Sequence, residues 1–231
     1  MTFTPLRPDT PYPMISGIVF DLDGTLADSL VDIATSVNLV LSREGLPTHP
    51  VEAFRLMVGN GMTTLVRRAL GPAASSIAGD AEVARLRAAV EAEYDRRCLD
   101  ETRPYPGIAE LLAALKAGKL RLAVLSNKPE AFTHRVVEAL FPGAGFDPVL
   151  GQGDRFPQKP DPAACLHIAA CWGLAPARLA LVGDSEVDMR TGLAAGLRPL
   201  GAAWGFRGRR ELEEAGAEGI LAEPRDLLTW L

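Results

Sequence analysis

The feature that most constrains the fold is a pair of aspartates placed directly after a short apolar run. Residues 18–20 are all apolar, and they are followed by Asp21-Leu22-Asp23-Gly24-Thr25. Such an uninterrupted run predicts a buried strand, and open α/β sheets place their ligands at the carboxyl ends of their strands. Gly24 allows the backbone to turn there, so we expect Asp21 and Asp23 to converge on one point.

These two carboxylates repel each other if both remain ionised. At a separation of about 4 Å the repulsion is roughly 4 kcal/mol for an effective dielectric constant near 20. A site that keeps Asp21 and Asp23 charged therefore needs a cation between them, and the sequence predicts one at this strand end.

Strand and helix patterns alternate along most of the chain. Apolar runs over residues 15–20, 120–125, 179–182 and 199–203, with weaker runs near 149 and 220–222, predict strands that are separated by helical periodicity. This alternation implies a parallel sheet covered by helices on both faces. Residues 30–99 instead show a helical pattern, with a loop expected over the turn-rich residues 72–79.

The sequence therefore predicts an α/β fold in which an all-helical domain is inserted after the first strand. We expect a Rossmann-like core with a parallel sheet over residues 15–27 and 104–231, and a helical cap domain over residues 28–103. Prolines are frequent before the first strand, and they predict a loose N-terminal extension over residues 1–14.

Composition argues against several classes of function. The 231 residues carry a net charge of −5 and contain no long basic run, so a nucleic-acid surface is not expected. No apolar window approaches the roughly 18 residues of a membrane span, and none is expected. The three cysteines show no CxxC spacing. Their odd number argues against a disulfide framework and favours a cytoplasmic location.

Three further polar segments follow predicted strands or precede a predicted helix. They are Ser126-Asn127-Lys128-Pro129, Lys159-Pro160-Asp161-Pro162 and Gly183-Asp184-Ser185-Glu186-Val187-Asp188. With the segment that begins at Asp21, they resemble in order the four motifs of the haloacid dehalogenase superfamily, and in particular of its aspartate-dependent phosphatases. The resemblance covers the chain from Ile15 onward. It implies a parallel-sheet core with an inserted cap and a phosphatase activity.

The resemblance also implies a role for each acidic residue. Asp21 is the expected nucleophile, which forms an aspartyl-phosphate, and Asp23 is the expected general acid and then base. The side chains of Asp21 and Asp184 and the backbone carbonyl of Asp23 are the expected ligands of Mg²⁺. That ion suits a site of few carboxylates with room for water and phosphate. Asp188 is expected to be an alternate or outer ligand.

Four other residues are expected to act on the phosphoryl group. Lys159 would offset the charges of the phosphate and the nucleophile. Ser126 and the backbone amide of Asn127 would bind one phosphate oxygen, and Thr25 would hydrogen-bond nearby. Taken singly, such residues have structural alternatives, for example a turn or a helix cap. For Lys128 a solvated loop position is the favoured interpretation.

The segment expected to select the substrate lies in the cap. Val58-Gly59-Asn60-Gly61-Met62, followed by Arg67-Arg68, resembles the cap segment of phosphoglycolate phosphatases. We therefore expect the backbone of Gly59, Asn60 and Gly61 to approach the substrate closely. Arg67 would pair with a substrate carboxylate. A plain helix–helix turn and solvated arginines remain the structural alternatives.

The expected reaction is the hydrolysis of 2-phosphoglycolate to glycolate and phosphate. Two segments depart from the commonest pattern of that group, Lys159-Pro160-Asp161-Pro162 and Ala203-Trp204-Gly205-Phe206. A sugar-phosphate phosphatase that acts, for example, on muramic acid 6-phosphate, a pyrophosphatase and a β-phosphoglucomutase-like phosphotransferase therefore remain alternatives. We expect a small-molecule phosphate ester as the partner, and a monomer or a homodimer.

Overall fold

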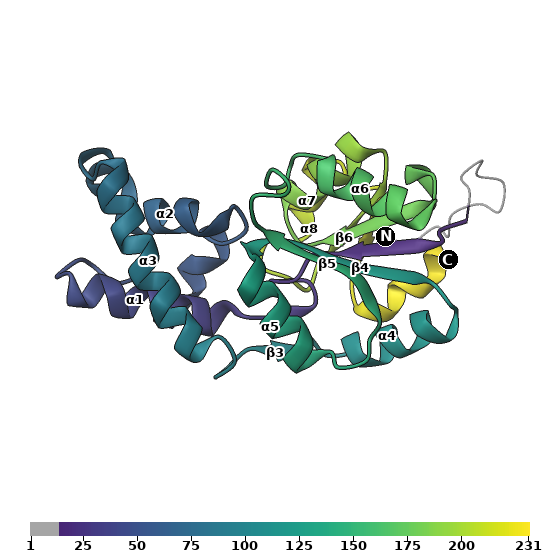
Figure 1. The fold of residues 1–231 in the computed structure, drawn as a ribbon, viewed down its shortest axis with the longest axis horizontal. Helices are drawn as coiled ribbons and strands as arrows, with labels where there is room; N and C mark the ends of the chain where they lie inside the picture. The colour runs from purple at the N-terminus through teal and green to yellow at the C-terminus, as the bar shows by residue number, and fades with distance from the viewer. Residues whose placement is uncertain (1–13) are drawn as a thin grey trace.

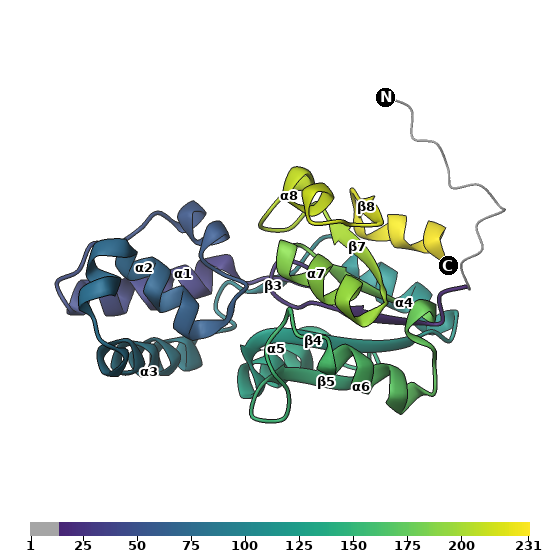
Figure 2. The same ribbon diagram turned by 90° about the horizontal axis from the view of Figure 1, so that it is seen from above.

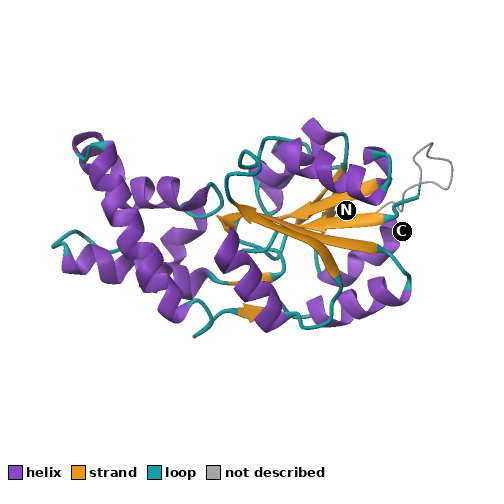
Figure 3. Cartoon of the chain, viewed as in Figure 1, coloured by secondary structure: helices purple, strands orange, loops and turns teal. Residues whose placement is uncertain are grey.

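The computed structural model describes residues 14–231, so the expected proline-rich extension lies, apart from Met14, outside the described residues. Six strands form one sheet in the order β5-β4-β1-β6-β7-β8 (Figure 3). In that order the strands are Phe146–Gln152, Arg121–Pro129, Gly17–Phe20, Leu179–Gly183, Arg198–Ala202 and Gly219–Leu221. Every neighbouring pair is parallel, which confirms the expected α/β architecture.

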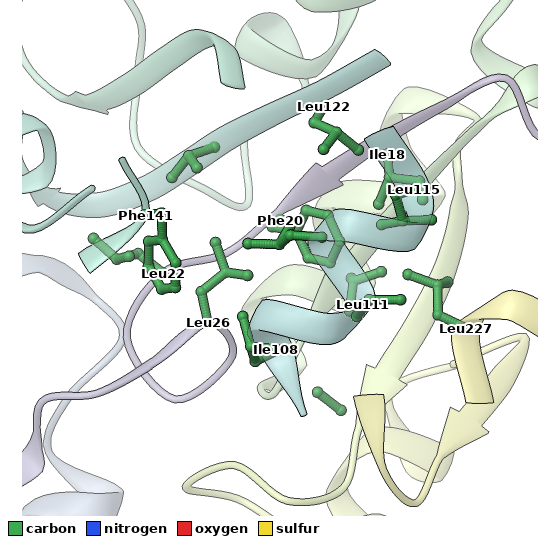
Figure 4. Close-up of a cluster of buried hydrophobic side chains, with 14 of the residues drawn as sticks. Ile18, Phe20, Leu22, Leu26, Ile108, Leu111, Leu115, Leu122, Phe141 and Leu227 are labelled. Carbon is green, nitrogen blue, oxygen red and sulfur yellow. The ribbon is translucent and has the colours of Figure 1, made fainter. Parts of the chain in front are cut away.

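Helices cover both faces of this sheet (Figure 1). On one face lie α4 (Ile108–Ala117), α5 (Glu130–Leu140) and the 3-10 helix η3 (Pro224–Trp230), and on the other lie α6 (Ala163–Trp172) and α7 (Glu186–Ala195). Ile18 and Phe20 pack among the apolar side chains of the first face (Figure 4), whereas Val19 belongs to the cluster on the second. Burial of both faces explains the uninterrupted apolar sequence of β1.

The second half of the core differs from the sequence prediction in two places. β4 continues past residue 125 as far as Pro129, which pairs with Gln152 of β5. Helix α8 (Arg209–Glu214) was not predicted, since Leu212 is its only buried residue and one apolar position gives no helical period. A short 3-10 turn, η2 (Pro176–Arg178), precedes β6.

The cap helices form a group of their own beside the sheet (Figures 1 and 2). They are α1 (Leu30–Arg43), the 3-10 helix η1 (Val51–Leu56), α2 (Gly61–Ile77) and α3 (Asp80–Arg97). Their apolar sides share a separate cluster that contains Ile33, Phe54, Leu65 and Val90. None of the helices within residues 14–231 combines the length and the apolar character that crossing a membrane requires.

The prediction of a loop over residues 72–79 is wrong for most of that segment, because helical structure continues to Ile77. The helix is interrupted at Gly71, whose φ of 75° and ψ of 166° are not helical. Pro72 then opens a new helical stretch. Proline suits the first position of a helix, where its fixed φ is already helical and its missing N–H has no intrahelical partner.

Two short strands join the cap to the core. β2 (Ala27–Asp28) and β3 (Arg103–Pro104) pair in antiparallel fashion. In the first turn of α1, the buried carboxylate of Asp32 accepts hydrogen bonds from the backbone N–H of Glu101 (3.0 Å) and of Thr102 (2.9 Å). It also accepts one from the Thr102 hydroxyl (2.6 Å). Asp32 therefore fastens the returning segment to the start of the cap.

We expect Asp32→Ala to lower the free energy of unfolding by about 3 kcal/mol, because it leaves the buried Thr102 N–H without an acceptor. Thr102→Val is the matched control. It removes only the hydroxyl bond and should cost about 1 kcal/mol. Urea unfolding of the two variants measures the difference, and equal losses would contradict a clamp that depends on the carboxylate.

Candidate active site

Three adjacent strands bring the polar motifs together. β4, β1 and β6 are neighbours in the sheet, and their carboxyl ends lie on the side of the sheet that faces the cap (Figure 3). Asp21 and Asp23 follow β1, Ser126 and Lys128 lie in the last part of β4, and Asp184 follows β6. The topology thus gathers segments far apart in the sequence at one sheet edge.

Lys159 is the cationic centre of this cluster. It lies in the loop between β5 and α6, and its side chain is only 3% exposed. The ammonium contacts Asp21 Oδ1 at 2.8 Å and Asp188 Oδ1 at 2.7 Å, and it donates to the carbonyl of Leu125 at 2.9 Å. All three donor positions of the ammonium are therefore used, and Lys159 fixes the orientation of Asp21.

Asp184 faces Asp21 from the neighbouring strand end. Its Oδ2 accepts a hydrogen bond from the backbone N–H of Phe206 at 2.7 Å, and its Oδ1 accepts a long bond of 3.4 Å from the Thr25 hydroxyl. The backbone at Gly24 and at Gly205 packs directly against Asp184, because a Cβ added at either glycine would lie 2.3 Å from an Asp184 atom. The segment around Gly205 therefore belongs to the site through its backbone, and Thr25 reaches Asp184.

Asp23 is paired with Lys128. The Lys128 ammonium lies 2.8 and 3.0 Å from the two carboxylate oxygens, and the Ser29 hydroxyl donates to Asp23 Oδ1 at 2.5 Å. The Lys128 side chain is 4% exposed, so the interpretation as a solvated loop residue is wrong. A sequence signal was available, because Ser126 and Lys128 are two residues apart and a continuing strand turns both to the same side.

Asn127 connects the core motifs to the cap. Its Oδ1 accepts a hydrogen bond from the backbone N–H of Lys159 at 2.8 Å, and its Nδ2 donates to the carbonyls of Lys159 and Gly59, each at 3.0 Å. The side chain of Asn127 is thus a structural bridge. Its backbone amide lies beside Ser126, whose hydroxyl accepts a bond of 3.3 Å from the N–H of Lys128.

The cap segment expected to contact the substrate is only partly at the site. Gly59 and Gly61 line the cavity between cap and core, and φ values of 111° and 79° explain why glycine occupies both positions. The Asn60 side chain is engaged elsewhere, since its Oδ1 accepts a hydrogen bond from Arg68 at 2.9 Å.

The structure does not bring Arg67 to the site. Its guanidinium pairs with Asp80 at the start of α3, and both side chains are exposed. The apolar residues Met62, Leu65 and Val66 take the inward positions of α2. Arg67 follows them on the outer side because successive helical residues turn by about 100°. The expected pairing of Arg67 with a substrate carboxylate is therefore not supported.

A cavity lies between the strand ends and the cap. Asp21, Asp23, Ser126, Asn127 and Lys128 line it from the core. Apolar side chains form much of its wall, and they are Ile33, Val58, Met62, Leu65 and Phe132, with the ring of Tyr94 beside them. The polar end of this cavity contains the predicted nucleophile and general acid, and the remaining wall is mostly apolar.

Burial and mutual repulsion alter the acidity of this cluster. Burial raises the pKa of Asp21 to about 7, and the negative charge of Asp188 adds to the rise. Burial also raises the pKa of Asp184 well above its usual range, with further contributions from Asp21 and Asp188. Burial alone would lower the pKa of Lys159, but the carboxylates of Asp188 and Asp21 outweigh it and keep the ammonium charged.

Asp21, Asp184 and Asp188 have the arrangement of a possible metal site. One carboxylate oxygen from each lies within 4.8 Å of the others, and all three residues are buried. The donors are oxygens only, which suits a hard cation such as Mg²⁺. Asp188 is the most engaged of the three, because Lys159 contacts its Oδ1 while the backbone N–H and hydroxyl of Ser185 donate to its Oδ2.

Comparison with known sequences gives the same family over most of the chain. The sequence model of the haloacid dehalogenase-like hydrolases matches residues 18–202. Phosphoglycolate phosphatase 1 of Pseudomonas aeruginosa is 37% identical over 214 residues, which cover 91% of this chain and 78% of that protein. The phosphoglycolate phosphatase of Nitrosospira multiformis is 36% identical over 215 residues, which cover 91% of this chain and 92% of that protein.

A solved structure has the same fold. The crystal structure of a predicted phosphoglycolate phosphatase from Haemophilus somnus superposes with a TM-score of 0.85 at 29% identity. The match covers 93% of this chain and 96% of that one, so it includes both the cap and the core. These similarities confirm the resemblance that the four motifs indicate. The chain belongs to the family of haloacid dehalogenase-like hydrolases, and it is a phosphatase of that family.

Proposed function

We propose that this phosphatase is Mg²⁺-dependent and hydrolyses a short phosphate monoester that carries a carboxylate, with 2-phosphoglycolate as the substrate. The observation that carries the proposal is the placement of Asp21, held by Lys159 beside Asp184, at a small cavity that also contains Asp23 and Lys128. The relatives named as phosphoglycolate phosphatases support the choice of substrate.

In the first half of the proposed reaction, a carboxylate oxygen of Asp21 attacks phosphorus and forms an aspartyl-phosphate. The phosphorus–oxygen bond of the ester breaks, and the departing alkoxide takes a proton from the Asp23 carboxyl group. Glycolate then leaves. The Ser126 hydroxyl and the backbone N–H of Asn127 would bind phosphoryl oxygens, as expected for a reaction that depends mainly on positioning and charge neutralisation.

In the second half, a water molecule attacks the aspartyl-phosphate. Asp23, now a carboxylate, accepts a proton from that water, and the bond between phosphorus and the Asp21 oxygen breaks. Inorganic phosphate leaves and both aspartates return to their starting states. Mg²⁺, bound by the side chains of Asp21 and Asp184 and the backbone carbonyl of Asp23, would neutralise charge on the phosphoryl group. Asp188 acts through Lys159, which it holds against Asp21.

The cavity wall favours a small leaving group over a sugar. A hexose has several hydroxyls to satisfy, and the cap presents the side chains of Ile33, Val58, Met62 and Leu65, which offer no hydrogen bonds. Pyrophosphate is the second candidate, because its leaving group is also small and anionic and Lys128 could receive it.

Asp21→Asn should lower kcat for 2-phosphoglycolate by at least about a thousandfold, because the amide cannot act as the nucleophile. The exposed Asp154, in the loop before Lys159, supplies a matched control, and Asp154→Asn should keep wild-type kcat. Steady-state kinetics and circular dichroism on both variants test the assignment. Comparable activity in folded Asp21→Asn protein would show that another group attacks phosphorus.

In a panel of esters, kcat/KM for 2-phosphoglycolate should exceed that for glucose 6-phosphate by at least about a hundredfold, because the sugar hydroxyls would be left unpaired. Phosphate release at matched substrate concentrations measures the ratio, with pyrophosphate included. A preference for the hexose phosphate would overturn the proposed substrate class.

Without divalent ions, the melting temperature Tm should fall as the pH rises from about 5 to about 8. The pKa of Asp21 in the folded chain is about 7, above its ordinary 3.8. Its contribution to stability is therefore complete below about pH 4 and is lost as the pH passes through 7. The raised pKa of Asp184 acts in the same direction.

Mg²⁺ should reverse this loss, so the gain in Tm on adding Mg²⁺ should be larger at pH 8 than at pH 6. Thermal unfolding in chelator and in Mg²⁺ at about these two pH values measures it. Asp184→Asn removes one titrating carboxylate and should reduce both the pH slope and the Mg²⁺ gain. An Mg²⁺ gain that is equal at the two pH values would contradict a metal site made from these buried acids.

A further inference from the structure

One buried polar group in the cavity has no role in the reaction proposed above. Tyr94 of α3 is 2% exposed, and its side chain lines the cavity. Within the described part of the chain, its hydroxyl makes no hydrogen bond of good geometry, although the Lys128 ammonium lies close enough to interact with it. A buried hydroxyl without a partner costs free energy, so a group of this kind in a cavity points to a ligand that supplies the missing bond.

The ring of Tyr94 is held independently of its hydroxyl. The Lys128 ammonium lies 4.6 Å from the ring centroid. Phe132 of α5 packs edge-on against the ring, with 5.2 Å between the centroids. Phenylalanine would keep both ring contacts and would lose only the interaction of the hydroxyl with Lys128.

Lys128 is the only cationic side chain among the described residues that line the cavity. The carboxylates of Asp21 and Asp23 repel an anion, and the cap wall is largely apolar. An anionic leaving group therefore finds its attractive charge at Lys128, beside Tyr94. A tyrosine hydroxyl donates a hydrogen bond to a carboxylate, and an ammonium pairs with it.

We propose that the Tyr94 hydroxyl and the Lys128 ammonium together bind the carboxylate of the leaving group, which makes Tyr94 a specificity-determining residue. This role rests on the proposed function, because it requires a short phosphate ester that bears a carboxylate. In 2-phosphoglycolate one methylene separates the ester oxygen from that carboxylate. Lys128 Nζ lies 2.8 Å from Asp23 Oδ1, so an ester oxygen placed at Asp23 brings the carboxylate within reach of Lys128.

The two binding groups come from different parts of the molecule. Tyr94 belongs to the cap and Lys128 to β4 of the core. A carboxylate that bridges them links the cap to the core at the moment when the ester oxygen is beside Asp23. A substrate without the carboxylate forms no such bridge, so the selection of substrate and the position of the cap depend on one pair of bonds.

Tyr94→Phe tests this role with two substrates that differ only in the leaving group. 2-Phosphoglycolate has the carboxylate, and ethyl phosphate has a methyl group in its place. In the variant, the ratio of kcat/KM for 2-phosphoglycolate to kcat/KM for ethyl phosphate should fall by about tenfold, since a hydrogen bond to a charged group is lost. The loss should be mainly a rise in KM for 2-phosphoglycolate. Tyr105→Phe removes a hydroxyl outside the cavity and should leave the ratio unchanged.

The outcomes separate this inference from the proposed function. If the wild type prefers 2-phosphoglycolate and Tyr94→Phe keeps that preference, the role of Tyr94 is overturned while the proposed substrate stands. If the wild type does not prefer 2-phosphoglycolate over ethyl phosphate, the proposal of a carboxylate-bearing substrate is overturned, and the role of Tyr94 is overturned with it. A fall in activity that is equal for both esters shows a structural role for the hydroxyl and also overturns the proposal.

Product inhibition gives a second measurement that does not depend on turnover of 2-phosphoglycolate. Glycolate should inhibit the hydrolysis of ethyl phosphate by the wild type. Its inhibition constant should rise by about tenfold in Tyr94→Phe. The Tm of the variant should stay close to that of the wild type, because the buried hydroxyl makes no hydrogen bond of good geometry within the described residues. An unchanged inhibition constant would contradict contact between the hydroxyl and the carboxylate.

Discussion

The constraint on which the rest of this structure depends is a group of four carboxylates, three of them buried, beside two buried lysine ammonium groups. Lys159 contacts Asp21 and Asp188, and Lys128 contacts Asp23, while Asp184 completes the acidic group. With every group ionised, the carboxylates exceed the ammonium groups by two charges. A divalent cation matches that excess. Without one, burial raises the pKa values of Asp21 and Asp184, and the negative charge of the neighbouring aspartates adds to the rise.

The fold explains how these charges are gathered and covered. The order of the parallel sheet places β4, β1 and β6 side by side, so their carboxyl ends bring the acidic side chains and Lys128 to one point, and the loop between β5 and α6 adds Lys159. The cap supplies the apolar wall that takes this point out of water, and Asn127 ties the cap backbone at Gly59 to the core. Exclusion of water strengthens each electrostatic interaction in the cluster, which benefits transfer of a highly charged phosphoryl group.

The fold class and the acidic core of the site could be predicted from sequence because each rests on local patterns. The apolar run before Asp21 is buried on both faces, and the polar motifs follow strands whose parallel order brings them together. The side chains around this acidic core were predicted less well. The sequence favours a solvated loop position for Lys128, but the extended backbone of β4 continues past residue 125 and turns Lys128 toward Asp23. The position of Arg67 after a glycine turn predicts contact with the substrate, but the apolar face of α2 directs Arg67 to Asp80. Tyr94 occupies an inward position of α3 that fits an ordinary core residue equally well.

We propose that Asp21 attacks phosphorus beside a metal ion held by Asp184. A crystal structure of the protein grown with Mg²⁺ and beryllium fluoride, which mimics a phosphoryl group on a carboxylate, tests it most directly. The predicted result is beryllium bonded to an oxygen of Asp21, with the metal ion in contact with Asp21 and Asp184. Beryllium bonded to a different side chain, or a metal ion bound away from Asp184, would contradict the claim.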